Sequence, residues 1–397
     1  MVTSRARAAL SRATLVSAAF CFALFVAECA TRSFTHVVPP LDAADATVGK
    51  TYARGFTGTV YVDECDCDVF LRFNREGFRG PDRPYDKEAS TRRVAVIGDS
   101  MIAAIATVEE DTLVSRLEDS LNGAGARADT SSDQSAKADV RGSDTWEVMN
   151  FGVSGAGTAQ ELVLYGERVR QYHPDVVVLG FFLRNDVVDN SPRLGSSPYI
   201  YFDIDEAGRL FRVRTDETRS GDGDWVNRHS RFYVWQKLML GRMRGRWGRL
   251  DRSRLAYLRS PDGDVAHAWE ITRALLTAFH EQVTADGASF IVAALPAAEA
   301  IYDDVWTDLL ARSGKEAALY DREFPERKLT EICSSAGIPL VTMAGVFRAA
   351  APHASSKRDD ERLFWQGIGH FDPHGNALAA AAIANALLTE SELRIRP

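Results

Sequence analysis

A serine that directly follows a predicted strand stands in a position typical of a nucleophile. The apolar run RVAVI (93–97) leads into Gly98, Asp99 and Ser100, which places a hydroxyl at the carboxyl end of a strand. A serine hydroxyl attacks an ester only when a base removes its proton and when donors stand ready for the oxyanion that forms. Ser100 therefore indicates acyl chemistry only if other segments supply those groups.

Three later segments offer candidate donors and bases. The segment NFGVSGAGT (150–158) follows the next predicted strand, and its glycines let backbone N–H groups approach a substrate closely. Asn185 follows the third strand and offers an amide donor. Near the C-terminus, GHFDPHGN (369–376) supplies two imidazoles with a carboxylate between them, just before a predicted final helix. Four loops thus offer a nucleophile, donors and a base.

The order of these blocks is similar to that of the SGNH hydrolases, also known as GDSL-type hydrolases. The matching blocks are GDSM, NFGVSGAGT, LRND and DPHGN, and the resemblance covers about 300 residues, from NREGFRG (74–80) to the last helix. It implies a three-layer α/β/α fold of the flavodoxin-like type and ester chemistry by a serine nucleophile. It implies neither a metal nor an organic cofactor.

The resemblance also implies a role for each matching residue. Ser100 is the expected nucleophile, and His374 is the expected general base, oriented by Asp372. The backbone N–H of Ser100, together with Gly155 and Asn185, forms the expected oxyanion hole.

Two alternatives to these assignments stay open. His370 is the other candidate base, and His374 is preferred because it aligns with Asp372 and lies nearer the final helix. Ser154 is the other candidate nucleophile, but Ala156 breaks the Gly-x-Ser-x-Gly elbow that an α/β-hydrolase would show. A metal site is not expected, because a proline separates the two histidines and no HExxH motif occurs.

Several neighbouring residues could shape the site. Asp99 is expected to be structural. Leu183 and Arg184 stand where many SGNH members have a Gly-x pair before Asn-Asp, so a bulky cation is expected to line the pocket and to favour an anionic or sugar substrate. Trp365 and Phe371 could stack on a sugar ring, but core packing is the preferred interpretation for both.

The elements that must position these residues follow from the apolar patterning. Apolar runs predict five buried strands at 93–98, 147–152, 175–183, 289–296 and 338–344, and spacings of three and four predict helices at 159–172, 264–285, 325–336 and 375–389. Continuous apolar strands that alternate with helices predict an α/β fold with a parallel sheet covered on both faces. Ligands of such folds bind beyond the carboxyl ends of the strands.

The remaining sequence predicts a domain organisation. Residues 31–56 contain two consecutive prolines and no helical or strand period, so a stalk is expected there. The hydrolase domain is expected over 57–397, with insertions at 122–144 and 190–262. The second insertion contains a hairpin-like stretch and is interpreted as a cap.

Residues 1–30 are typical of an export signal. Arg5, Arg7 and Arg12 precede an uncharged, mostly apolar run at 13–27. An uncleaved membrane anchor is the preferred interpretation, and a cleaved signal peptide or a buried helix are the alternatives. With the arginines held inside, the rest of the chain lies outside the cytoplasm.

Charge and cysteine content exclude several classes of function. The 397 residues carry 47 Lys and Arg against 55 Asp and Glu, so no broad positive field exists for nucleic acid. Cys65 and Cys67 are expected to stand too close to pair with each other, although either could bridge to Cys333 or stay a thiol. No paired Cys-x-x-Cys spacing indicates zinc.

The sequence therefore predicts an exported, membrane-tethered serine esterase that hydrolyses an O-acyl ester through an acyl-enzyme intermediate. Carbohydrate O-acetyl groups are one candidate substrate. The alternatives are an O-acyltransferase of exported polysaccharide and a non-catalytic sugar-binding or assembly protein with the same fold.

Overall fold

The computed structural model describes residues 4–35, 37, 40–128, 145–195, 200–213, 224–245, 252–351, 362–365 and 369–389. The chain divides into two compact units. The smaller unit comprises the described residues before Asp42 and those between Arg219 and Leu250, and the larger unit comprises the remainder.

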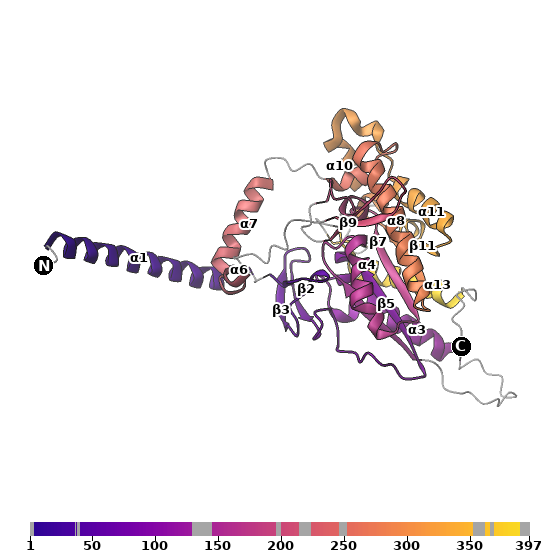
Figure 1. The fold of residues 1–397 in the computed structure, drawn as a ribbon, viewed down its shortest axis with the longest axis horizontal. Coiled ribbons are helices and arrows are strands. Elements are labelled where there is room, and N and C mark those ends of the chain that lie inside the picture. Colours follow the sequence, from indigo (N-terminus) through magenta and orange to yellow (C-terminus); the bar gives the residue numbers. More distant parts are fainter. Residues whose placement is uncertain are drawn as a thin grey trace. The chain divides into compact units, whose positions relative to one another are not determined.

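A five-stranded parallel sheet forms the centre of the larger unit (Figure 1). Its order is β11-β10-β7-β5-β6, and the strands are β5 (Thr91–Gly98), β6 (Thr145–Gly152), β7 (Val176–Phe182), β10 (Ser289–Leu295) and β11 (Leu340–Thr342). Every neighbouring pair is parallel. The five predicted strands and the α/β class are confirmed.

Helices cover both faces of this sheet, which makes the three layers α/β/α. One face packs on α4 (Thr158–Glu167), α8 (Gly263–Ala285) and α11 (Phe324–Ala336), and the other on α3 (Leu113–Ala128), α12 (Ala344–Ala350) and α13 (Pro373–Thr389). The central strand β7 is buried along its whole length, with Val177 and Leu179 in one core and Val176 and Val178 in the other. This burial on both faces explains the continuous apolar runs in the sequence.

Shorter elements connect these layers. Beside the sheet lie α2 (Ser100–Ala103), α5 (Asp186–Asp189), α9 (Ala298–Ile301), α10 (Asp303–Ser313) and the 3₁₀ turns at Glu109–Asp111, Val169–Tyr172, Arg252–Tyr257 and Gly314–Leu319. Three antiparallel hairpins are β1 (Asp42–Asp45) with β2 (Gly49–Tyr52), β3 (Thr57–Val62) with β4 (Cys67–Arg72), and β8 (Tyr201–Ile204) with β9 (Leu210–Val213).

The first hairpin corrects the stalk expected over 31–56. Residues 42–52 form β1 and β2, and Val48 and Tyr52 are fully buried in the larger unit. The apolar side chains there are too sparse to show a strand period, but two of them reach the core. Any stalk therefore ends before Asp42.

Three glycines at the carboxyl ends of neighbouring strands let α2 sit directly on the sheet. Gly98 pairs in register with Gly152 on β6 and with Gly180 on β7. A Cβ on Gly98 would lie 2.4 Å from Ile102 Cγ1, and a Cβ on Gly152 would lie 2.2 Å from the backbone nitrogen of Ala103. Only glycine allows this approach, and α2 begins at Ser100.

The two predicted insertions differ in how much of them the structure describes. In the first, α3 continues to Ala128, and residues 129–144 lie outside the described residues. In the second, the β8–β9 hairpin belongs to the larger unit, whereas α6 (Asp224–His229) and α7 (Arg231–Gly245) belong to the smaller unit. The predicted cap is thus divided between the two units.

The smaller unit also contains α1 (Ser4–Phe34). Its segment Arg12–Phe34 has a mean hydropathy of 2.0 and is long and apolar enough to cross a membrane. Its Glu28 carboxylate accepts hydrogen bonds from the backbone N–H groups of Arg231 and Phe232, both at 3.0 Å, and from the hydroxyl of Ser230 at 2.9 Å. These are the first N–H groups of α7, so Glu28 caps that helix from a distant part of the sequence.

Candidate active site

Ser100 lies where the sequence places it, on the turn between β5 and α2. The Asp99 carboxylate accepts a hydrogen bond from the Met101 N–H at 2.8 Å and caps α2. Asp99 is fully buried, as its expected structural role requires. The cap fixes the turn that presents the Ser100 hydroxyl.

His370 contacts this hydroxyl, and Glu64 contacts His370. His370 Nε2 lies 2.8 Å from Ser100 Oγ, and His370 Nδ1 lies 2.7 Å from Glu64 Oε2. The backbone N–H of His370 also donates to Glu64 Oε1 at 3.3 Å. An ionised carboxylate can only accept, so Nδ1 carries the proton and Nε2 is left to accept from the serine hydroxyl. This is the order of groups in a serine hydrolase triad.

The structure does not bring His374 and Asp372 to the nucleophile, which corrects the expected base and its partner. The His374 side chain is 71% exposed, and its Nδ1 lies 3.9 Å from Asp372 Oδ2. Asp372 instead accepts a hydrogen bond from the Gly375 N–H at 2.9 Å, at the start of α13. Aspartate before a proline in the first turn is a common helix start, so the DPHG pattern reports a helix terminus.

The sequence does not point to Glu64, because the residues next to it in the chain do not indicate a catalytic role. It lies in the turn between β3 and β4, 306 residues from His370. Its one local signal is the acidic stretch DECDCD, and acidic turns are common on protein surfaces. The contact depends on the tertiary fold, which carries this hairpin to the carboxyl end of the sheet.

Gly155 and its loop are held open beside the sheet. Gly155 has a φ of 74°, and a Cβ there would meet no atom within 4 Å. The preceding Ser154 is engaged with Tyr52, since its N–H donates to the Tyr52 oxygen at 3.0 Å and the two hydroxyls lie 2.6 Å apart. Ser154 therefore anchors the loop, and the structure places no base beside it among the described residues.

The Asn185 amide faces two carboxylates. Its Nδ2 donates to Asp189 Oδ2 at 2.8 Å and to Asp99 Oδ2 at 3.3 Å. Both amide hydrogens are thus engaged. Asn185 lies at the correct end of the sheet for an oxyanion donor, but it must exchange one of these bonds to serve as one.

A group of carboxyl groups lies beneath Asn185. Asp99, Glu161 and Asp186 are fully buried, and burial together with their mutual repulsion raises the pKa of Glu161 and Asp186 well above the ordinary values. Burial and the charge of Asp99, opposed by the hydrogen bond from Asn185, raise the pKa of Asp189 to about 6. Among the described residues, no group of three or more acidic, histidine or cysteine side chains could hold a metal ion.

Arg184 lies beside the His370 loop, but its charge is paired. Its Nε lies 3.2 Å from Glu299 Oε1, and the Glu299 side chain is only 6% exposed. A Cβ on Gly369 would lie 3.5 Å from Arg184 Nη1, which places the guanidinium next to the residue before His370. Arg184 therefore presents a polar, largely neutralised group near the site.

The aromatic residues that flank His370 differ in role. Phe371 is 2% exposed and packs on Phe347 and Phe364, with ring centroids 4.9 and 5.3 Å apart. It belongs to the core, as preferred from the sequence. The backbone N–H of Trp365 donates to the His370 carbonyl at 2.8 Å, so this contact helps to hold the loop.

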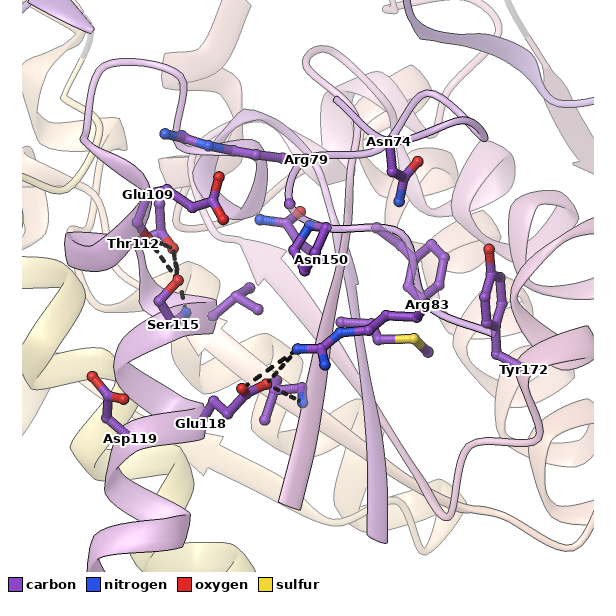
Figure 2. A pocket seen from close by; sticks show the side chains of 16 residues that line it. Asn74, Arg79, Arg83, Glu109, Thr112, Ser115, Glu118, Asp119, Asn150 and Tyr172 are labelled. Atoms are coloured by element: carbon purple, nitrogen blue, oxygen red, sulfur yellow. Dashed lines mark hydrogen bonds and ion pairs between the residues drawn. The ribbon is translucent and has the colours of Figure 1, made fainter. Parts of the chain in front are cut away.

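A polar cavity lies at the open edge of the sheet, away from the triad (Figure 2). Its volume is about 170 Å³, and it is lined by α3, β6 and residues 74–83. Arg83 reaches Glu118 across it at 3.4 Å. Neither Ser100 nor His370 lines this cavity.

Cys65 and Cys67 form a disulfide with each other, which corrects the expectation that they stand too close to pair. Their Cα atoms are 5.1 Å apart, within the ordinary range for a disulfide. Asp66 between them has a φ of 51°, and this left-handed residue folds the turn so that the two side chains meet. Cys333 is a buried free thiol in α11.

Comparisons with known proteins give structural matches alone. No protein-family model and no curated protein matches the sequence. An acetyl xylan esterase is 14% identical, with a TM-score of 0.39 over 74% of this chain and 99% of that chain. A GDSL-like lipase from Bacteroides thetaiotaomicron is 11% identical, with a TM-score of 0.36 over 77% of this chain and 92% of that chain. An acetylxylan esterase from Geobacillus stearothermophilus, solved as a catalytic mutant, is 12% identical, with a TM-score of 0.39 over 76% of this chain and 95% of that chain. The solved structures to which this chain is similar thus include GDSL-type lipases and acetyl xylan esterases.

Proposed function

We propose that the chain is a serine ester hydrolase whose catalytic triad is Ser100, His370 and Glu64. The observation that carries the proposal is the unbroken contact from Ser100 Oγ through His370 to the Glu64 carboxylate, at 2.8 and 2.7 Å. All three groups meet beyond the carboxyl end of β5, where parallel α/β folds bind their ligands.

The proposed mechanism moves one proton back and forth through His370. Nε2 takes the proton of Ser100 as Oγ attacks the acyl carbon, and the Glu64 carboxylate stabilises the imidazolium that forms. The imidazolium then gives the proton to the leaving alkoxide, which departs as an alcohol and leaves an acyl group on Ser100. A water molecule then attacks this ester while His370 takes one of its protons, and His370 returns that proton to the Ser100 oxygen as the acyl–oxygen bond breaks and the carboxylic acid leaves.

The proposed oxyanion hole uses the Ser100 N–H, the Gly155 N–H and the Asn185 amide. The open, positive-φ conformation of Gly155 supports its role, because no side chain obstructs the N–H. Asn185 would release its longer bond, at 3.3 Å to Asp99, and turn that hydrogen toward the substrate oxygen.

We propose an O-acyl ester as the substrate, with carbohydrate O-acetyl groups as the first class to test. The ion pair between Arg184 and Glu299 lies beside the His370 loop. It supports a substrate with polar groups near the ester rather than a long apolar chain. The site requires no cofactor for this reaction.

We further propose that the protein is exported and held in the membrane by α1. The composition of Arg12–Phe34 supports an anchor. The Cys65–Cys67 disulfide supports an oxidising compartment, since such bonds are rare in the cytosol.

A matched pair of histidine variants tests the proposed triad. Full-length protein in detergent is treated with a fluorophosphonate probe, which labels an activated serine, and turnover of 4-nitrophenyl acetate is measured in parallel. Ser100→Ala and His370→Ala should lose labelling and turnover, whereas His374→Ala should keep both. Loss in His374→Ala with retention in His370→Ala would overturn the proposed base. Product analysis with acetylated xylan and a free sugar acceptor separates hydrolysis from acyl transfer.

A further inference from the structure

We infer that the Cys65–Cys67 disulfide positions the Glu64 carboxylate, so that the thiol or disulfide state of this pair sets the rate of the esterase. The inference rests on the proposed function, because it assigns Glu64 to the triad. The disulfide lies outside the reacting groups. It acts on them through Glu64, the residue directly before Cys65 in the sequence.

The disulfide lies in the same turn as Glu64. The β3–β4 pairing ends at Val62 and Cys67, so residues 63–66 form the turn. Glu64 is in this turn and is directly followed by Cys65, whose sulfur is bonded to Cys67 at the foot of β4. The disulfide therefore ties the half of the turn that follows Glu64 to the strand, and it limits where the Glu64 backbone can lie.

The turn that holds Glu64 carries a high negative charge. Asp63, Asp66 and Asp68 are exposed and lie within four residues of Glu64. Four carboxylates in so short a stretch repel one another and favour an opened turn. Asp66 is also in the left-handed region, at a φ of 51°, which Asp adopts more readily than most residues but which still favours glycine. The disulfide, which bridges the two neighbours of Asp66, and the hydrogen bond from the Tyr61 hydroxyl to the Asp66 carboxylate both hold this conformation.

The contact between Glu64 and His370 tolerates little displacement. One oxygen lies 2.7 Å from His370 Nδ1 and the other accepts the His370 backbone N–H at 3.3 Å, so the carboxylate fixes both the ring and its loop. The Glu64 side chain is only 9% exposed. A displacement of about 1 Å in such a constellation can lower a rate by roughly 10²-fold.

The chemical step is an ordinary thiol–disulfide exchange. A dithiol reductant transfers two electrons and two protons to the pair, the Cys65–Cys67 bond breaks to give two thiols, and the reductant closes to its own cyclic disulfide. Both cysteines are partly exposed, so a small dithiol can reach them. Before export the pair is reduced and the esterase is slow. In an oxidising compartment a disulfide oxidant takes up two electrons and two protons and is reduced to a dithiol, the Cys65–Cys67 bond forms, and the esterase becomes fully active.

The test uses full-length protein in detergent and three variants. Cys65→Ala/Cys67→Ala removes the bond, Glu64→Gln removes the group that it positions, and Cys333→Ala is the control for the remaining buried thiol. For 4-nitrophenyl acetate, we expect kcat of the double cysteine variant to fall at least about tenfold with little change in KM. Adding Glu64→Gln to that variant should cost much less than Glu64→Gln costs in the wild type, since both changes act on one contact.

Reduction of the wild type provides a second measurement that does not depend on a variant's folding. Dithiothreitol should slow the wild type and Cys333→Ala to the rate of the double cysteine variant, reoxidation should restore both, and the double variant should not respond. Wild-type turnover in the double variant, or a wild type that is insensitive after its disulfide is shown to be reduced by mass spectrometry, would overturn the inference. Failure of the proposed function looks different, because turnover would then survive Ser100→Ala and His370→Ala.

Discussion

Replacing Glu64 with glutamine is the sharpest perturbation of the triad, because it removes a charge and keeps the shape. When Ser100 attacks, His370 becomes positively charged, and the Glu64 carboxylate stands 2.7 Å from its Nδ1. With roughly 4 Å between the centres of the two charges and an effective dielectric constant of about 20, their attraction is worth about 4 kcal/mol. The expected loss in kcat/KM is therefore about a thousandfold.

The assay compares kcat/KM for 4-nitrophenyl acetate with the melting temperature of the same preparation. The matched control is His374→Gln, at a side chain that is 71% exposed, and we expect its rate to stay within about twofold of the wild type. A loss of kcat/KM below about tenfold in a folded Glu64→Gln variant would refute the assignment of Glu64 as the partner of His370. Solvent screening of a partly exposed pair does not remove most of the attraction over so short a distance.

Three further outcomes test other parts of the structure. Asp372→Ala should lower the free energy of unfolding by about 1 kcal/mol through loss of the α13 cap while kcat stays near the wild-type value, and a collapse of kcat would return Asp372 to the catalytic machinery. Asn185→Ala should reduce kcat by about 10²- to 10³-fold if its amide binds the oxyanion, and a loss below about threefold would remove it from the mechanism. Because the pKa of Asp189 is raised to about 6, the folded protein holds this proton more tightly than the unfolded chain does, so stability falls as pH rises from about 4 to 6. Asp189→Asn should remove that component, at most about 3 kcal/mol, and identical urea unfolding profiles against pH in both proteins would contradict it.

The elements of the fold could be predicted because they depend on local pattern. Both faces of the sheet are buried, so β5, β6 and β7 are continuous apolar runs that need no tertiary information to recognise. Gly98 and Ser100 also follow from local sequence, since a strand that ends on a small residue and a hydroxyl defines a tight turn. The predicted nucleophile therefore stands in its expected place.

The partners of Ser100 could not be predicted with the same success, because they meet only after folding. Two histidines four residues apart present the same chemistry in sequence. The folded loop before α13 brings His370 to Ser100, whereas His374, in the first turn of α13, is 71% exposed. The sequence favoured His374 as the base because it lies close to Asp372. In the structure Asp372 caps α13 instead. Glu64 lies in a separate hairpin, so no spacing rule connects it to His370.

The hydrogen bonds from α7 to Glu28 bear on what happens to the leading segment of the chain. In this segment the Glu28 carboxylate accepts hydrogen bonds from the first N–H groups of α7, a helix of the same unit. Cleavage by a peptidase after residue 30 would remove Glu28 and leave the first N–H groups of α7 without this acceptor. These contacts therefore support the proposed membrane anchor.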